Sequence, residues 1–270
     1  MWRWGVLAFV IAAAIAEGAT MIARYGADVN HFDFSGPCAF RSTDHWGWLE
    51  SKSDQADAKT LRVLFVGDSL TYVNDLPGML VRVASSDPTT PSRLEVRSVT
   101  APNASLSNLW DQGCGLSRLK TDHYDVAVLQ EHSYFWYPEM AEPAREAAGR
   151  WISAVRSFGA RPIYFEPWTD EDDPYSDKGE ALEAAQDNAK MYGADIARVG
   201  EAFAQARVSN GAPNLFASDH HHPSEAGSWL AALVIFHGLT GEPTERVTWR
   251  PAAVTPDQAA TLERIADQYG

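Results

Sequence analysis

A serine near the start of the chain, together with an aspartate and a histidine about 150 positions later, could perform nucleophilic catalysis. Ser69 follows a short apolar run and a glycine-containing turn, so its hydroxyl is expected where a buried strand ends. Asp219 and His222 lie three positions apart in a loop that enters a helix at Pro223. At this spacing the carboxylate can bond one imidazole nitrogen and leave the other free to face the serine. These residues therefore indicate a Ser-His-Asp triad, which is defined by roles and not by chain order.

Two blocks of sequence resemble the first and last motifs of the SGNH hydrolases, also called GDSL-type esterases and lipases. The blocks are Gly67-Asp68-Ser69-Leu70 and Asp219-x-x-His222-Pro223, and the resemblance covers roughly 61–239. It implies that Ser69 attacks an ester carbonyl and that His222 acts as general base and then general acid, oriented by Asp219. It also implies an ester hydrolase that forms an acyl-enzyme. We expect no cofactor, and the expected substrate is a small-molecule or glycan ester.

The resemblance further implies an oxyanion hole, and here the sequence departs from the family pattern. Ser69 and Asn103 are expected to donate backbone N–H groups, although Asn103 stands where the family has a glycine. Asparagine tolerates the left-handed backbone region, but it could instead simply cap the following helix. The family's asparagine after the third strand is missing. Gln130 supplies a neutral amide there and is the expected donor, with His132 as the alternative.

Alternating apolar and amphipathic segments must position these residues. Strands are expected at 61–66, 94–99, 125–129, 162–166 and 195–199. Helices are expected between them, one of which spans 143–158. The alternation predicts a three-layer α/β/α sandwich with a central five-stranded parallel sheet, in a flavodoxin-like arrangement. The family resemblance implies the same fold.

Aromatic and acidic residues are expected around the site. Tyr134, Trp136 and Trp168 would form a substrate rim, which favours a carbohydrate-linked, short-chain or acetyl ester. The acidic stretch 169–177 would be a mobile rim or substrate-facing flap, or otherwise a solvated face. A different class of function stays open, because a catalytically weak or inactive hydrolase fold could hold a glycan on the same rings.

The run of three histidines offers a second alternative, metal-assisted hydrolysis. Adjacent side chains on an extended loop point in different directions, so three consecutive histidines rarely bind one ion. We therefore expect no metal site, with His220 and His221 lining the mouth of the site or facing water.

Composition and charge limit the partners. The chain has 270 residues, 45% of them apolar, which is enough for one large α/β domain. Its net charge of −14 argues against nucleic acid and anionic lipid headgroups, since both require a basic surface. A monomeric acidic enzyme is expected.

The first 23 residues form a candidate targeting segment. An apolar run from Gly5 to Ala16 is too short for a comfortable membrane span and ends in an Ala-x-Ala pattern before Glu17. This pattern predicts an exported protein, periplasmic or secreted, with an uncleaved membrane anchor as the alternative. An irregular lead-in would follow over 24–60, and the catalytic domain would span 61–270. Whether Cys38 and Cys114 pair stays open.

Overall fold

The computed structural model describes residues 60–88, 93–172 and 179–270. These residues all fall within one compact unit of the chain, 33–270. The candidate targeting segment, the lead-in and Cys38 lie outside the described residues. None of the helices within the described ranges is long and apolar enough to cross a membrane.

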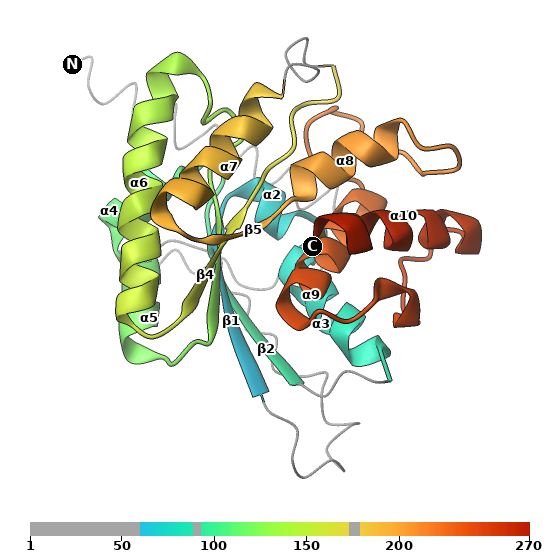
Figure 1. Cartoon of the computed structure of the whole chain (residues 1–270), viewed down its shortest axis with the longest axis horizontal. Helices are drawn as coiled ribbons and strands as arrows, with labels where there is room; N and C mark the ends of the chain where they lie inside the picture. The colour runs from blue at the N-terminus through green and yellow to red at the C-terminus, as the bar shows by residue number, and fades with distance from the viewer. Residues whose placement is uncertain (1–59, 89–92, 173–178) are drawn as a thin grey trace, which may run out of the picture. The chain divides into compact units, whose positions relative to one another are not determined.

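A five-stranded, all-parallel sheet forms the centre of the fold (Figure 1). Its order in space is β2, β1, β3, β4, β5, which is the flavodoxin-like order. The strands are β1 (Thr60–Gly67), β2 (Arg93–Thr100), β3 (Val126–Gln130), β4 (Arg161–Phe165) and β5 (Asp195–Ala197). The central part of β1, from Val63 to Val66, is completely buried, because helices cover both faces of the sheet. The predicted fold class is thus confirmed.

Two helical layers enclose the sheet (Figure 1). One layer contains α4 (Leu106–Gln112), α5 (Cys114–Thr121), α6 (Pro138–Ser157) and α7 (Glu180–Tyr192). The other contains α3 (Leu76–Ser86), α8 (Val199–Arg207), α9 (Glu225–Thr240) and α10 (Pro256–Tyr269). Two apolar cores result, one on each face of the sheet.

Helix α6 begins earlier than the sequence pattern predicts. The prediction placed its start at Pro143, but the helix starts at Pro138 and Pro143 lies inside it. A proline there removes one backbone hydrogen bond close to the start of the helix. The buried face formed by Ala147, Trp151 and Ile152 compensates by packing on the sheet.

Helix α9 is buried over most of its length and fixes the loop before it. Its residues from Ala226 to Phe236 are all buried, and it packs against α3, α8 and α10. The Ser224 side chain caps its first turn by accepting a hydrogen bond from the N–H of Gly227. A Cβ atom on Gly227 would lie 2.2 Å from the carbonyl oxygen of Leu215, so only glycine permits this approach. The loop that ends at Pro223 is therefore anchored to the core.

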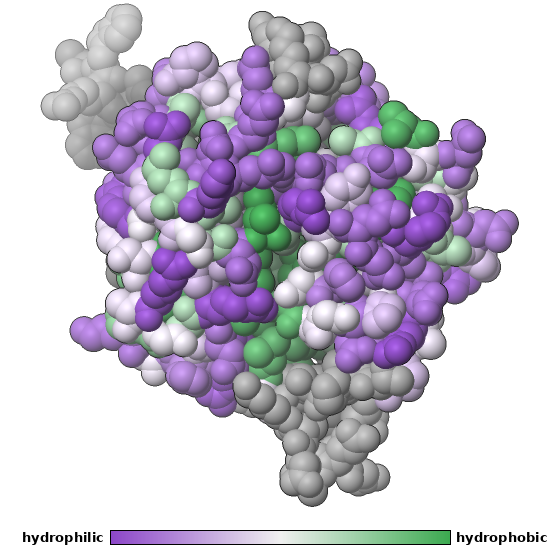
Figure 2. Space-filling view, viewed as in Figure 1, coloured by the Kyte–Doolittle hydropathy of each residue, from purple (hydrophilic) through white to green (hydrophobic). Residues whose placement is uncertain are grey.

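Figure 2 shows that the surface facing the viewer is mostly hydrophilic, with a narrow hydrophobic strip between the two helical layers. This distribution agrees with the acidic composition of the chain.

Candidate active site

The turn after β1 presents the candidate nucleophile. The short helix α2 (Ser69–Tyr72) starts at Ser69, and the Asp68 carboxylate caps it by accepting from the N–H of Leu70 at 3.0 Å. The Ser69 side chain is largely buried, and its hydroxyl makes no hydrogen bond with any described residue. Burial, only partly offset by hydrogen bonds from Leu70 and Gln130, raises the pKa of Asp68 to about 6.

The loop 217–222 presents the candidate base. Its ends are held by a bridge between Phe216 and Pro223, so it closes like a hairpin loop. Oδ2 of Asp219 lies 2.9 Å from Nδ1 of His222, while Oδ1 accepts the N–H groups of His221 and His222. Burial opposes ionisation of Asp219, but these hydrogen bonds outweigh it and lower the pKa of the carboxyl. Nε2 of His222 makes no hydrogen bond with any described residue.

Asn74 links the segment of Ser69 to the loop of His222 by hydrogen bonds. It adopts a left-handed conformation with φ 56°, just after α2. Its Nδ2 donates to the carbonyl oxygen of Pro223 at 2.9 Å and to the Ser228 hydroxyl at 3.0 Å. The segment that carries Ser69 is thus bonded directly to the residue after His222. No local pattern in the sequence points to this contact, since Asn74 and Pro223 are 149 positions apart.

A second histidine–carboxylate pair lies beside the first. Nδ1 of His221 is 2.5 Å from Oδ1 of Asp170, and Oδ2 of Asp170 accepts the Tyr134 hydroxyl at 2.8 Å. The rings of Tyr134 and His221 stack at 5.8 Å, and Nε2 of His221 is 3.5 Å from the Ser133 hydroxyl. Burial would lower the pKa of His221, but the Asp170 carboxylate outweighs it and raises that pKa. Sequence reasoning missed this pair.

The three consecutive histidines have different partners. His220 is exposed and pairs with Glu171 at 2.7 Å, whereas His221 and His222 are mostly buried and bond Asp170 and Asp219. Within the described part of the chain, no group of side chains is arranged to hold a metal ion.

The loops after β2 and β3 meet at the same edge of the sheet. Asn103, after β2, has φ 55°, and its Oδ1 lies 2.7 Å from Nε2 of His132, after β3. Beneath them, Oε1 of the fully buried Glu131 accepts the N–H groups of Leu106 and His132 at 2.9 and 2.8 Å. Because β1 lies between β2 and β3, this bridge passes the end of the strand that leads to Ser69.

Comparison with known proteins identifies the fold. No protein-family model and no curated protein matches the sequence. Among solved structures, a candidate SGNH hydrolase from Slackia heliotrinireducens is 25% identical with a TM-score of 0.54, covering 67% of this chain and 100% of that one. A lipase/acylhydrolase from Enterococcus faecalis is 16% identical with a TM-score of 0.52, covering 71% and 100%. The chain has the SGNH hydrolase fold. A DUF4886 family protein from Bacteroides uniformis shares it at 14% identity and a TM-score of 0.65, covering 78% of this chain and 94% of that one.

The predicted oxyanion donor, Gln130, lies in the core beneath the turn that carries Ser69. Its side chain is fully buried. Oε1 accepts the N–H of Asp68 at 2.9 Å and the Thr71 hydroxyl at 2.8 Å, and Nε2 donates to the carbonyl oxygen of Glu131. A Cβ atom on Gly67 would lie 2.5 Å from this Oε1, so the glycine makes room for the amide. Gln130 therefore braces the turn that carries the candidate nucleophile, and its amide is bonded within the core.

Two of the three predicted rim residues are also corrected. Trp168 is 3% exposed, stacks on Phe203 at 4.1 Å, and donates its indole N–H to the carbonyl oxygen of His221. Trp136 is 9% exposed and packs edge-on against Phe135. Their large apolar rings fill the core, so neither offers a platform to a sugar. Tyr134 is half-buried beside His221 and remains a candidate.

The buried carboxyl of Glu131 should make the stability of the protein pH-dependent. Burial raises its pKa from 4.5 to about 7, so between these values the folded chain binds more protons than the unfolded chain. The free energy of unfolding should therefore fall as pH rises through this window, by about 2–3 kcal/mol from this group alone. Asp68 and Glu166, whose pKa values burial raises to about 6 and about 7, act in the same direction.

Glu131→Gln keeps the oxygen that accepts two N–H groups and removes the ionisation. We expect the drop in unfolding free energy between pH 5 and pH 8 to shrink by about 2–3 kcal/mol in this variant, measured by urea unfolding at both pH values. An unchanged pH dependence would show that Glu131 is not the responsible group.

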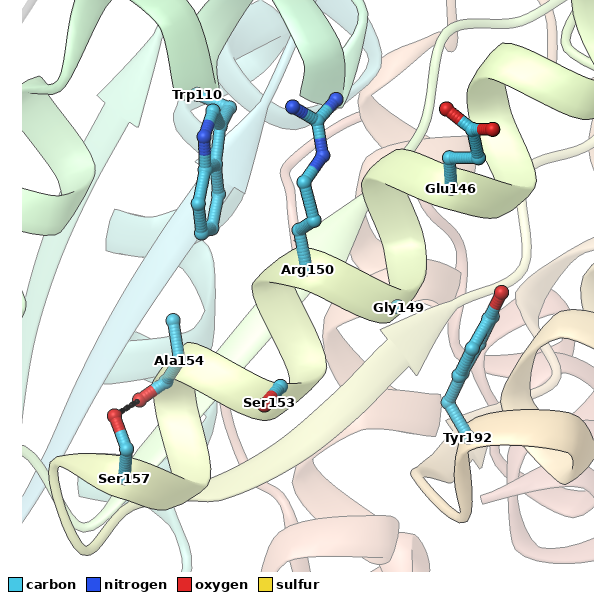
Figure 3. Close-up of a pocket in the computed structure, with 8 residues that line it drawn as sticks. All are labelled: Trp110, Glu146, Gly149, Arg150, Ser153, Ala154, Ser157 and Tyr192. Carbon is cyan, nitrogen blue, oxygen red and sulfur yellow. Dashed lines mark hydrogen bonds between the residues drawn. The ribbon is translucent and has the colours of Figure 1, made fainter.

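A groove of about 670 Å³ lies elsewhere, along the outer side of α6 (Figure 3). Trp110, with Arg150 stacked over its ring at 5.3 Å, and Tyr192 line it. Ser157, at its end, donates its hydroxyl to the carbonyl oxygen of Ala154. The groove contains no histidine or paired carboxylate to activate a hydroxyl, so the candidate chemistry belongs at the strand ends and not here.

Proposed function

We propose that this chain is a serine ester hydrolase that cleaves short-chain or acetyl esters, carbohydrate-linked ones among them, through an acyl-enzyme. The observation that carries the proposal is the His222 ring, held by Asp219 at 2.9 Å with its other nitrogen free. Its loop is bonded through Asn74 to the segment of Ser69. Hydrolases among the structural neighbours support ester hydrolysis as the general chemistry.

In the proposed reaction, Oγ of Ser69 attacks the ester carbonyl carbon while Nε2 of His222 takes the hydroxyl proton. The imidazolium that forms is stabilised by Asp219 and gives its proton to the departing alcohol, leaving an acyl group on Ser69. Water then attacks the acyl carbon with His222 again as base, which releases the carboxylic acid and restores the serine. The Ser69 hydroxyl must approach His222 when substrate binds, as is common for hydrogen bonds that are loose in free enzymes.

Two backbone N–H groups are available to bind the oxyanion that would form from the ester carbonyl. The N–H groups of Ser69 and Asn103 donate no hydrogen bond to any described residue. They follow the adjacent strands β1 and β2, so both lie at the edge of the sheet where the ester carbonyl would bind.

The burial of Ser69 bears on the size of the acyl group. Ser69 is only 7% exposed, which favours a small acyl group over a long chain. Of the three predicted rim residues, only Tyr134 still supports a carbohydrate leaving group, since Trp136 and Trp168 are buried. The same burial weakens the glycan-binding alternative, which needs those rings at the surface.

A panel of esters and a covalent label test the proposal. We expect the purified chain to hydrolyse aryl acetate faster than aryl decanoate, and to release acetate from acetylated oligosaccharides. A fluorophosphonate should modify Ser69, identified by mass spectrometry of the labelled peptide, and not Ser133, a buried serine whose hydroxyl lies 3.5 Å from Nε2 of His221. Absence of both hydrolysis and labelling would contradict the proposal, and labelling of Ser133 would contradict the choice of nucleophile.

A further inference from the structure

The bridge between His132 and Asn103 determines which atoms of Asn103 remain available. Nδ1 of His132 lies 3.2 Å from the backbone nitrogen of Tyr134. A backbone N–H can only donate, so Nδ1 must be the acceptor and must carry no proton. In the neutral ring the proton then sits on Nε2, which donates to Oδ1 of Asn103 at 2.7 Å.

The surroundings of His132 favour this neutral ring. Burial, followed by the charge of the neighbouring His221, lowers the pKa of His132. Its Nε2–H therefore remains a donor and holds the side-chain oxygen of Asn103. The amide nitrogen of Asn103 is consequently turned away from His132.

Asn103 thus carries two donors without an acceptor. Its backbone N–H makes no hydrogen bond with a described residue, and neither does its Nδ2. The side chain is exposed in the loop after β2, and β2 lies next to β1, the strand that leads to Ser69. Gln130, by contrast, is committed to the nucleophile turn.

We propose that Asn103 supplies two oxyanion donors, its backbone N–H and its side-chain amide, and that His132 is the positioning residue that aims the amide. The side-chain amide that the SGNH pattern places after the third strand is then carried by the loop after the second. This inference deepens the proposed function and rests on Ser69 being the nucleophile of an ester hydrolase.

Asn103→Gly is the sharpest test, because glycine keeps the N–H, suits φ 55°, and removes only the amide. We expect kcat and kcat/KM to fall together by about 10²–10³, with KM little changed. Asn103→Asp should lose at least as much, since a carboxylate donates nothing and repels the oxyanion. Asn210→Gly, at an exposed asparagine in the loop after α8, is the control and should behave as wild type.

The positioning role of His132 is tested by combining its variants with Asn103→Gly. His132→Ala should lower kcat by about tenfold to a hundredfold, and His132→Gln, which can still donate to Oδ1, should recover part of it. In an Asn103→Gly background, His132→Ala should cause no further loss. Nitrogen-15 spectra of the His132 ring should show the proton on Nε2, a result that does not depend on activity.

Three results would overturn the inference. They are near-normal kcat/KM in Asn103→Gly, a full loss from His132→Ala in the Asn103→Gly background, or a proton on Nδ1 of His132. If any of these occurs while Ser69 is labelled and esters are cleaved, only this inference fails. If the wild-type chain neither reacts at Ser69 nor cleaves esters, the proposed function fails and this inference fails with it.

Discussion

Ser69→Ala is expected to lower kcat for ester hydrolysis by at least about 10⁴-fold while the chain stays folded. In the proposed mechanism the alanine removes the atom that forms the acyl-enzyme, so only the catalysis that substrate binding and the proposed oxyanion donors provide would remain. Stability should change little, because the Ser69 hydroxyl makes no hydrogen bond with any described residue whose loss would cost free energy. Initial rates on an aryl acetate and thermal melting measure the two effects.

Ser133→Ala is the matched control for this change. Ser133 is buried to a similar degree, and its hydroxyl lies 3.5 Å from Nε2 of His221, so it imitates a nucleophile beside a base. We expect this variant to keep most of its activity. Loss of activity in Ser133→Ala together with a working Ser69→Ala would mean that the other histidine–carboxylate pair performs the chemistry.

His222→Ala is expected to cause a loss of similar size, at least about 10⁴-fold in kcat, because no other described group is bonded to Asp219 through a ring nitrogen. His221→Ala is its control, since the same change is made one position earlier in the same loop. That variant should stay within about tenfold of wild type, because His221 bonds Asp170 instead. A reversed order of losses, measured by the same assay, would assign the base to His221.

The fold was predictable from sequence because its signals are local. Short apolar runs that alternate with helical segments predict a parallel sheet between two layers, and the observed strands agree within a few residues. The pairing of Asp219 with His222 was predictable for the same reason, as the two lie three positions apart in one loop. Both features are determined by residues that are close together in the sequence.

Other parts of the site depend on contacts between distant segments and could not be predicted in this way. Whether an amide at a strand end faces the core or the edge depends on the space beside it, which for Gln130 is provided by Gly67. Trp168, in the loop after β4, is buried because Phe203 of α8 covers it. The pair His221–Asp170 joins residues 51 positions apart and has no sequence pattern.

The bond from Asn74 to Pro223 has a consequence for the order in which the chain acquires its structure. Ser69 belongs to the first strand–helix unit, whereas His222 is held in place by α9, four strands later. Contacts between residues 149 positions apart must wait for the loop between them to close, at an entropic cost that local contacts do not carry. The candidate nucleophile and the candidate base are therefore brought together only when α9 docks beside α3.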